Sequence, residues 1–115
     1  MPNRVTRVNG LLQREIGEQL RRHFGGSESV RITISEVDTS SDLRRCNIYY
    51  SVIGDAQAVV ESEAFFRRIG KELRERVMKR IVLKYFPRFE FIYDPSMERG
   101  AKLVEMLDQI DNENG

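Results

Sequence analysis

The hydrophobic period of this chain changes along its length, and these changes constrain the fold more than any other feature. Apolar residues recur every three or four positions over residues 4–24, which predicts an amphipathic helix that the glycines of "FGGS" end. From Val30 apolar and polar residues alternate, and this period of two predicts half-buried strands. A helical period returns at Asp55 and persists to Phe86. The sequence therefore predicts a mixed α+β fold.

Two strands are predicted between the helical segments. The run "VRITISEV", residues 30–37, alternates apolar with polar residues from its first position. The run "LRRCNIYYSVIG" is rich in strand-forming residues, and one of its faces carries Cys46, Ile48, Tyr50 and Val52. Between the runs, "DTSSD" offers side chains that bond the local backbone and so favour a turn. Two runs joined by so short a connection predict an antiparallel pair.

The helical segment 55–86 contains Gly70, a residue that costs about 1 kcal/mol relative to alanine in a helix interior. The sequence leaves two alternatives open at this position: either the helix bends, or two helices meet. The predicted buried stripe of the segment consists of Val59, Phe66, Ile69, Leu73, Val77 and Ile81.

Pro87 closes the helical segment, and the run that follows, "RFEFIYD", predicts a third strand with Phe89, Phe91 and Tyr93 on one face. A last helix is expected over "SMERGAKLVEMLDQI", with Ser96 as its cap, followed by a flexible end at 111–115. Residues 1–115 thus form one domain with an ordered core at 4–110 and the order α-β-β-α-(kink)-α-β-α. We expect a three-stranded sheet with the helices on one face.

The net charge of +1 conceals a strong segregation, because residues 67–84 contain eight basic and only two acidic residues. A partner responds to the local field and not to the total charge. A phosphate backbone is the partner that best explains such a segment, although a solvated helix or an acidic protein partner would also fit. The basic residues of this segment are Arg67, Arg68, Lys71, Arg74, Arg76, Lys79, Arg80 and Lys84.

Two further cations, Arg4 and Arg7, lie at the start of the first predicted helix. Positive charge there opposes the helix dipole, so their placement suggests a use other than helix stability. We therefore include both in the predicted RNA-binding set.

Residues for catalysis or metal binding are scarce. Cys46 is the one cysteine and His23 the one histidine, and neither falls into a zinc-binding or nucleophile spacing. We expect no enzyme activity, no metal and no cofactor. A single cysteine and the absence of a signal-peptide or membrane-spanning pattern lead us to expect a cytoplasmic protein that does not bind a membrane. We expect a monomer, because no sequence feature points to a larger assembly.

The predicted order is the plan of a type II KH-like domain, in which paired helices and a neighbouring strand form the RNA-binding side. The G-x-x-G loop that such domains usually use as a clamp is absent, because no two glycines of this chain are three positions apart.

Three short motifs in the right order show that the sequence resembles the ribosome-binding factor A family, whose members assist assembly of the small ribosomal subunit in bacteria. "RVTRV" at 4–8 resembles the opening R-x-x-R-V of the family. "ITISEVDTSSDLRRCNIYYSVIGD" is similar to its first two strands, with Ser40, Asp42 and Leu43 at the turn. "PRFEFIYDPSMERG" resembles its P-x-[LI]-x-F-x-x-D-x-S-x-x-x-G segment, and the similarity spans residues 4–110.

The resemblance implies a non-catalytic factor that binds the immature small (30S) subunit, assists maturation of 16S rRNA near its 5′ end and matters in the cold. It also implies a helix kink in place of the G-x-x-G loop. The family marks this kink by Ala-x-Gly, whereas the aligned residues of this chain are Ile69, Gly70 and Lys71. The alternatives that remain are a KH-like module with a non-ribosomal RNA target and a domain that docks an acidic protein.

Overall fold

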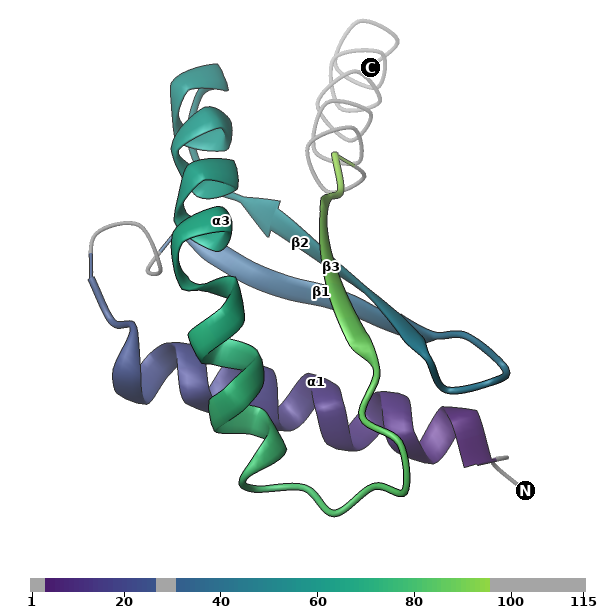
Figure 1. The fold of residues 1–115 in the computed structure, drawn as a ribbon. Coiled ribbons are helices and arrows are strands. Elements are labelled where there is room, and N and C mark those ends of the chain that lie inside the picture. Colours follow the sequence, from purple (N-terminus) through teal and green to yellow (C-terminus); the bar gives the residue numbers. More distant parts are fainter. Residues whose placement is uncertain (1–3, 27–30, 96–115) are drawn as a thin grey trace, which may run out of the picture.

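The computed structural model describes residues 4–26 and 31–95 and shows two helices and one sheet (Figure 1). The elements in chain order are helix α1 (Arg4–His23), strands β1 (Ile32–Thr39) and β2 (Arg45–Val52), helix α3 (Ala56–Met78) and strand β3 (Arg88–Tyr93). The expected α+β class and three-stranded sheet are confirmed. The expected final helix and the flexible end at 111–115 lie outside the described residues.

The three strands form one sheet in the order β1-β2-β3. Strands β1 and β2 pair antiparallel, as their short connection predicts, whereas β3 pairs with β2 in parallel and places Phe91 beside Ile48. Parallel neighbours need a long crossover, and α3 provides it. Because β2 is the central strand, β3 forms one edge of the sheet and β1 the other.

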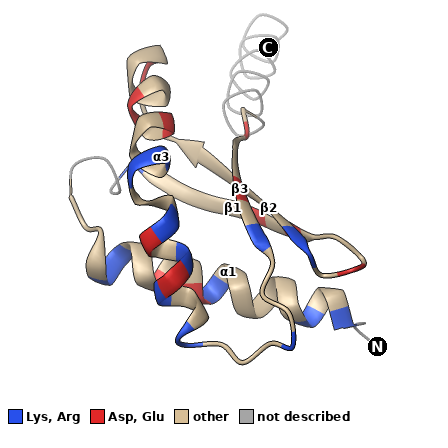
Figure 2. Ribbon diagram, viewed as in Figure 1, with Lys and Arg blue, Asp and Glu red and all other residues tan. Residues whose placement is uncertain are grey.

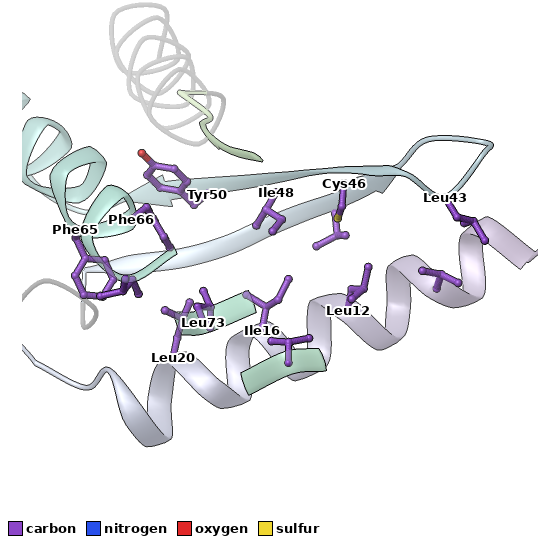
Figure 3. Close-up of a cluster of buried hydrophobic side chains, with 14 residues drawn as sticks. Leu12, Ile16, Leu20, Leu43, Cys46, Ile48, Tyr50, Phe65, Phe66 and Leu73 are labelled. Atoms are coloured by element: carbon purple, nitrogen blue, oxygen red, sulfur yellow. The ribbon is translucent and has the colours of Figure 1, made fainter. Parts of the chain in front are cut away.

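Both helices contribute to one core against a single face of the sheet (Figure 3). Alternate residues of β2, namely Cys46, Ile48 and Tyr50, point toward the helices and are at most 1% exposed. Burying a side chain such as that of Ile48 contributes roughly 1.5–3 kcal/mol to the free energy of folding. The helical part of the core consists of Val8, Leu12, Ile16 and Leu20 from α1 and Phe65, Phe66, Ile69, Leu73 and Val77 from α3.

The inward face of β1 changes halfway along the strand, which simple alternation does not predict. A β-bulge lies between Ile34 and Glu36, so Ser35 is the extra residue. Ile32 and Ile34 are half-buried before the bulge, and Val37 and Thr39 are buried after it. The extra residue shifts the side-chain parity by one, as bulges do. Val30, which the alternation places in the strand, lies outside the described residues.

The turn from β1 to β2 is held by its own polar side chains. The Asp42 carboxylate accepts from the Ser40 hydroxyl at 2.6 Å and from the Arg44 backbone N–H at 3.1 Å. The Ser40 hydroxyl in turn accepts from the Arg45 N–H at 3.0 Å. These bonds lower the pKa of Asp42, with the Ser40 hydrogen bond as the largest cause. Leu43 has a φ of 61°, which places its side chain in the core at a cost in backbone strain.

Helix α3 begins where the sequence indicates and ends earlier than its hydrophobic period suggests. Asp55 caps the helix, since its carboxylate accepts from the Ala58 N–H at 3.0 Å. The helix ends at Met78, although the prediction extended it to Phe86. Pro87 disfavours helix in the residue before it, and β3 must run back along β2, so residues 79–87 form a loop.

The predicted stripe of α3 needs two corrections. Ile81 lies in the loop and is half-buried, and Val59 is half-buried because the inward positions of the first turns are Ala58 and Ser62.

At Gly54, just before the helix, φ is +144° and a Cβ atom would approach the Ala58 Cβ to 2.7 Å, so the chain needs glycine there.

Candidate nucleic-acid interface

Nine of the ten predicted RNA-binding cations fall into three separate places, and α3 does not present one uniform basic face (Figure 2). Residues of one helix that are three or four positions apart share a face, so the cations of α3 divide between its two flanks. One flank faces β3 and the other faces α1. A third group lies around the N-terminal half of α1.

The flank toward β3 forms what we call the α3–β3 groove, a hollow of about 610 Å3. Its wall on α3 contains Arg67, Lys71 and Arg74, and Arg88 of β3 also belongs to its lining. Its lining also contains four aromatic residues and two carboxylates, which are Tyr50, Phe66, Phe89, Phe91, Glu63 and Glu90. Phe66 and Phe91 stack with their ring centroids 4.5 Å apart and an angle of 12° between the rings.

Gly70 lies in this groove, where α3 packs on β3 beside Phe91. Helix α3 is continuous from Ala56 to Met78, so two separate helices do not meet at Gly70. A Cβ atom at this position would lie 3.4 Å from the ring of Phe91, which is an ordinary contact. Of the other residues predicted to form the kink, Ile69 belongs to the core and Lys71 is exposed in the groove.

Arg74 has a structural role in addition to its place in the groove. Its guanidinium donates to the backbone oxygen of Pro87 at 3.0 Å and to that of Phe86 at 3.1 Å. It also lies over the Phe86 ring, 5.3 Å from the centroid. Hydrogen bonds from a charged donor contribute about 1.5–3 kcal/mol. Arg74 therefore ties the loop at 79–87 to α3.

The flank toward α1 forms what we call the α1–α3 cluster, where most charges are paired. Its lining contains Gln19, His23, Glu72, Glu75, Arg76, Lys79 and Arg80. The Arg76 guanidinium bonds the Glu72 carboxylate at 3.1 Å, and Arg80 lies 3.4 Å from the Glu15 carboxylate. Arg76 also lies over the ring of Phe24. Arg76 and Arg80 therefore already have partners within the protein.

The third group surrounds what we call the N-terminal hollow, of about 720 Å3. Arg4 and Arg7 line it from α1, and Lys84 lines it from the loop, so the structure brings these predicted residues together. Arg14 joins them, which sequence reasoning missed. The signal was present, because positions 4, 7 and 14 fall on one helix face. Among the described residues, the lining contains four cations and no carboxylate.

The cations of the N-terminal hollow are not paired. Among residues 4–26 and 31–95, Arg4, Arg7 and Arg14 have no ion-pair partner, and all three are exposed. The hollow is also apolar at its edge, where Val82 is 99% exposed and Leu11 is 47% exposed. The first turn of α1 has no acidic residue to balance Arg4 and Arg7. This cost to the helix has no compensation within the described part of the chain.

The remaining predicted cation, Arg68, is exposed on α3 and lies over the ring of Phe65 at 5.7 Å from the centroid. It lines neither the α3–β3 groove nor the N-terminal hollow.

The groups that most often carry catalysis are not arranged for it in the described residues. Cys46 is fully buried, and burial raises the pKa of its thiol to about 11, which keeps it protonated. Residues 4–26 and 31–95 contain no cluster of three metal-ligating side chains of the His, Cys, Asp or Glu type. No helix in these ranges is both long and apolar enough to cross a membrane.

Comparison with known proteins agrees with this geometry. Residues 4–107 match the family model described as ribosome-binding factor A. The chain is 42% identical over 113 residues to ribosome-binding factor A of Opitutus terrae, covering 98% of this chain and 92% of the relative. It is 34% identical over 111 residues to the protein of the same name from Akkermansia muciniphila, covering 96% and 87%.

Solved structures show the same fold. The crystal structure of ribosome-binding factor A from Thermus thermophilus matches with a TM-score of 0.69 at 16% identity, over 79% of this chain and 97% of that one. The solution structure of a Thermotoga maritima protein described as a putative ribosome-binding factor A matches with a TM-score of 0.62 at 22% identity, over 75% and 82%. A Thermus thermophilus model fitted into the map of a complex of the 30S subunit with ribosome-binding factor A gives a TM-score of 0.60 at 18% identity, over 76% and 91%. Three motifs occur in the family's order, the fold is the same, and the family model matches nearly the whole chain. The chain therefore belongs to the ribosome-binding factor A family.

Proposed function

We propose that this protein binds the small ribosomal subunit as a non-catalytic assembly factor in the cytoplasm. Family membership and the fitted complex of the Thermus thermophilus protein with the 30S subunit support this proposal. The protein binds an immature conformation of 16S rRNA near its 5′ end, biases the folding of that region and then leaves. Such a step needs no covalent reaction. The protein should matter most in the cold, because RNA then folds into its mature form more slowly.

The observation that carries this proposal is the composition of the α3–β3 groove. Arg67, Lys71 and Arg88 provide positive charge beside two half-buried rings, those of Phe89 and Phe91. Groups of these two kinds, cations for phosphates and rings for unstacked bases, are what single-stranded RNA requires. Arg4, Arg7 and Lys84 extend the positive surface at the N-terminal hollow. Arg76 and Arg80 contribute less, because carboxylates already hold them.

Sedimentation with purified ribosomal particles tests the proposal. The protein should migrate with small subunits through a gradient at low salt and dissociate as salt rises, because RNA binding releases counterions. It should not migrate with large subunits or complete ribosomes. A protein that stays at the top of the gradient at low salt would contradict the proposal.

Charge reversal in the groove gives the matched comparison. Lys71→Glu should weaken the association, since Lys71 is exposed and has no protein partner among the described residues. Arg31→Glu, an equal change in net charge at an exposed site outside the groove, should leave it intact. Nuclease treatment separates RNA from an acidic protein as the contact. Association that survives digestion of the RNA would favour the protein partner.

A further inference from the structure

The α3–β3 groove and the N-terminal hollow both carry positive charge, but their other residues differ in kind. The lining of the groove includes two half-buried rings, Phe89 and Phe91, and two glutamates, Glu63 and Glu90. Among the described residues, the lining of the hollow has neither kind: apart from its four cations, it consists of small or aliphatic residues and one threonine. Sites with such different chemistry suit different parts of an RNA molecule.

The groove suits unpaired nucleotides. Carboxylates repel phosphates, yet they accept hydrogen bonds from the amino groups on base edges. Those edges and the faces of the bases are accessible only where the RNA is single-stranded. Glu63 and Glu90 therefore fit a groove that receives bases, with the neighbouring cations directed at the backbone.

The hollow suits the backbone of a double helix. Cations without carboxylates match phosphates, and the absence of rings among its lining residues leaves no stacking surface for a base. The face of α1 that carries Arg4, Arg7 and Arg14 extends over about 15 Å, because a helix rises about 1.5 Å per residue. Duplex RNA is recognised by the shape of its backbone and by its sugars, which need such an extended line of contacts.

The two sites belong to one unit because the loop at 79–87 connects them. Lys84 and Val82 of this loop line the hollow, and Arg88, just after the loop, lines the groove. Arg74, on the groove wall, fixes the end of the loop through its bonds to Phe86 and Pro87. The distance between the sites is therefore set by the fold.

We propose that the protein recognises a junction between single-stranded and double-helical RNA, with the single strand in the α3–β3 groove and the adjoining helix at the N-terminal hollow. This inference rests on the proposed function and adds the class of RNA structure that the protein selects. A junction of this kind is a feature of RNA that has not finished folding, because the unpaired strand is still available.

Three fluorescent RNAs test this inference by anisotropy: a short single strand, a blunt hairpin, and the same hairpin carrying that strand as a 3′ extension. The extended hairpin should bind at least about tenfold more tightly than either part, since the second contact becomes intramolecular. Equal affinities for the extended hairpin and its better part would overturn the proposal.

Two single reversals and a control assign the parts. Arg7→Glu should weaken binding of both hairpins about tenfold and leave binding of the single strand unchanged. The variant should still fold, because a Glu in the first turn of a helix stabilises that helix. Arg67→Glu should weaken the single strand and the extended hairpin but not the blunt one. Arg31→Glu, exposed and outside both sites, should change none of the three.

Two results would contradict the assignment and separate it from the proposed function. If Arg7→Glu weakens all three RNAs equally, the hollow does not select duplex. If Arg7→Glu changes no RNA affinity but releases the protein from small subunits, the hollow contacts an acidic ribosomal protein instead. In both cases co-sedimentation of the unmodified protein with small subunits would still support the proposed function, whereas its loss would remove that function itself.

Discussion

Helix α1 passes two basic regions, one near each end, and they differ in how their charges are satisfied. In the part of the chain that the structure describes, the N-terminal hollow has four cations and no carboxylate in its lining. The α1–α3 cluster, beside the C-terminal half of α1, has Arg76, Lys79 and Arg80, but Glu72, Glu75 and Glu15 lie among them. Each region has several cations, but three carboxylates balance the three cations of the second, and Figure 2 shows acidic residues interspersed there.

The comparison teaches that the positive surface of this protein is defined by missing carboxylates more than by the number of cations. An exposed ion pair contributes little to stability, often less than about 1 kcal/mol. It does, however, cancel most of the field that a phosphate would feel at that place. The most basic segment of the sequence is therefore not, over its whole length, the most basic surface.

The largest expected difference comes from two lysines that are five positions apart. Lys84 lines the hollow, and Lys79 lines the cluster at the end of α3. Lys84→Glu should weaken binding to small subunits about tenfold, which corresponds to about 1.4 kcal/mol. Lys79→Glu should weaken it less than about twofold. Titration of labelled protein with subunits at several salt concentrations measures both, and equal losses would contradict the distinction between the regions.

The largest effect on stability, as distinct from binding, is expected from removing the support of the hollow. Arg74→Ala deletes two charged hydrogen bonds to the end of the loop at 79–87 and should lower the free energy of unfolding by about 1.5–3 kcal/mol. Lys71→Ala, an exposed change on the same helix, should lower it by less than about 0.5 kcal/mol. Urea denaturation compares the two. Similar midpoints would mean that Arg74 does not anchor the loop.

A smaller and favourable effect is expected at the groove. Gly70→Ala should raise the free energy of unfolding by about 0.5–1 kcal/mol, because alanine suits a helix better and its methyl group contacts Phe91 at an ordinary distance. The melting temperature should increase by about 4 °C. Gly17→Ala in α1, where no atom lies within 4 Å of the new Cβ, is the control. A decrease at Gly70 alone would show that the groove needs the space.

The smallest predicted effect would weaken the contrast between the regions. Glu15→Gln removes the carboxylate beside Arg80 while keeping the oxygen that accepts from Gln19. We expect RNA affinity to rise about two- to threefold as Arg80 becomes available, with a change in stability below about 0.5 kcal/mol. Glu61→Gln, at an exposed position near the start of α3, provides the same change in charge as a control. An equal rise in both would indicate a general effect of net charge.

Hydrophobic period was sufficient to predict the type and order of the described elements and most of their buried residues. It failed where the backbone departs from a regular period. Ser35 adds a residue to β1 and reverses the inward face, and no local pattern marks it. The helical period continues past Met78 to Phe86, but the requirement that β3 return along β2 ends α3 first.

The candidate sites were only partly predictable, because which charged side chains pair with one another depends on the tertiary structure. The sequence identified the basic residues, and its motifs identified the family. It could not show that Arg80 meets Glu15, 65 positions earlier, or that Arg74 bonds the backbone of Phe86 and Pro87. Lys84 likewise joins Arg4 and Arg7 only through the packing of the loop against α1.

The parallel pairing of β3 with β2 has a consequence for synthesis of the protein. Chains emerge from the ribosome N-terminus first, at about 5–20 residues per second. The hollow needs Val82 and Lys84, and the groove needs Arg88 and Phe91, so neither exists until nearly the whole described chain has emerged. A nascent or truncated chain that ends before Val82 can form α1, the β1–β2 hairpin and α3, but it lacks both proposed RNA sites.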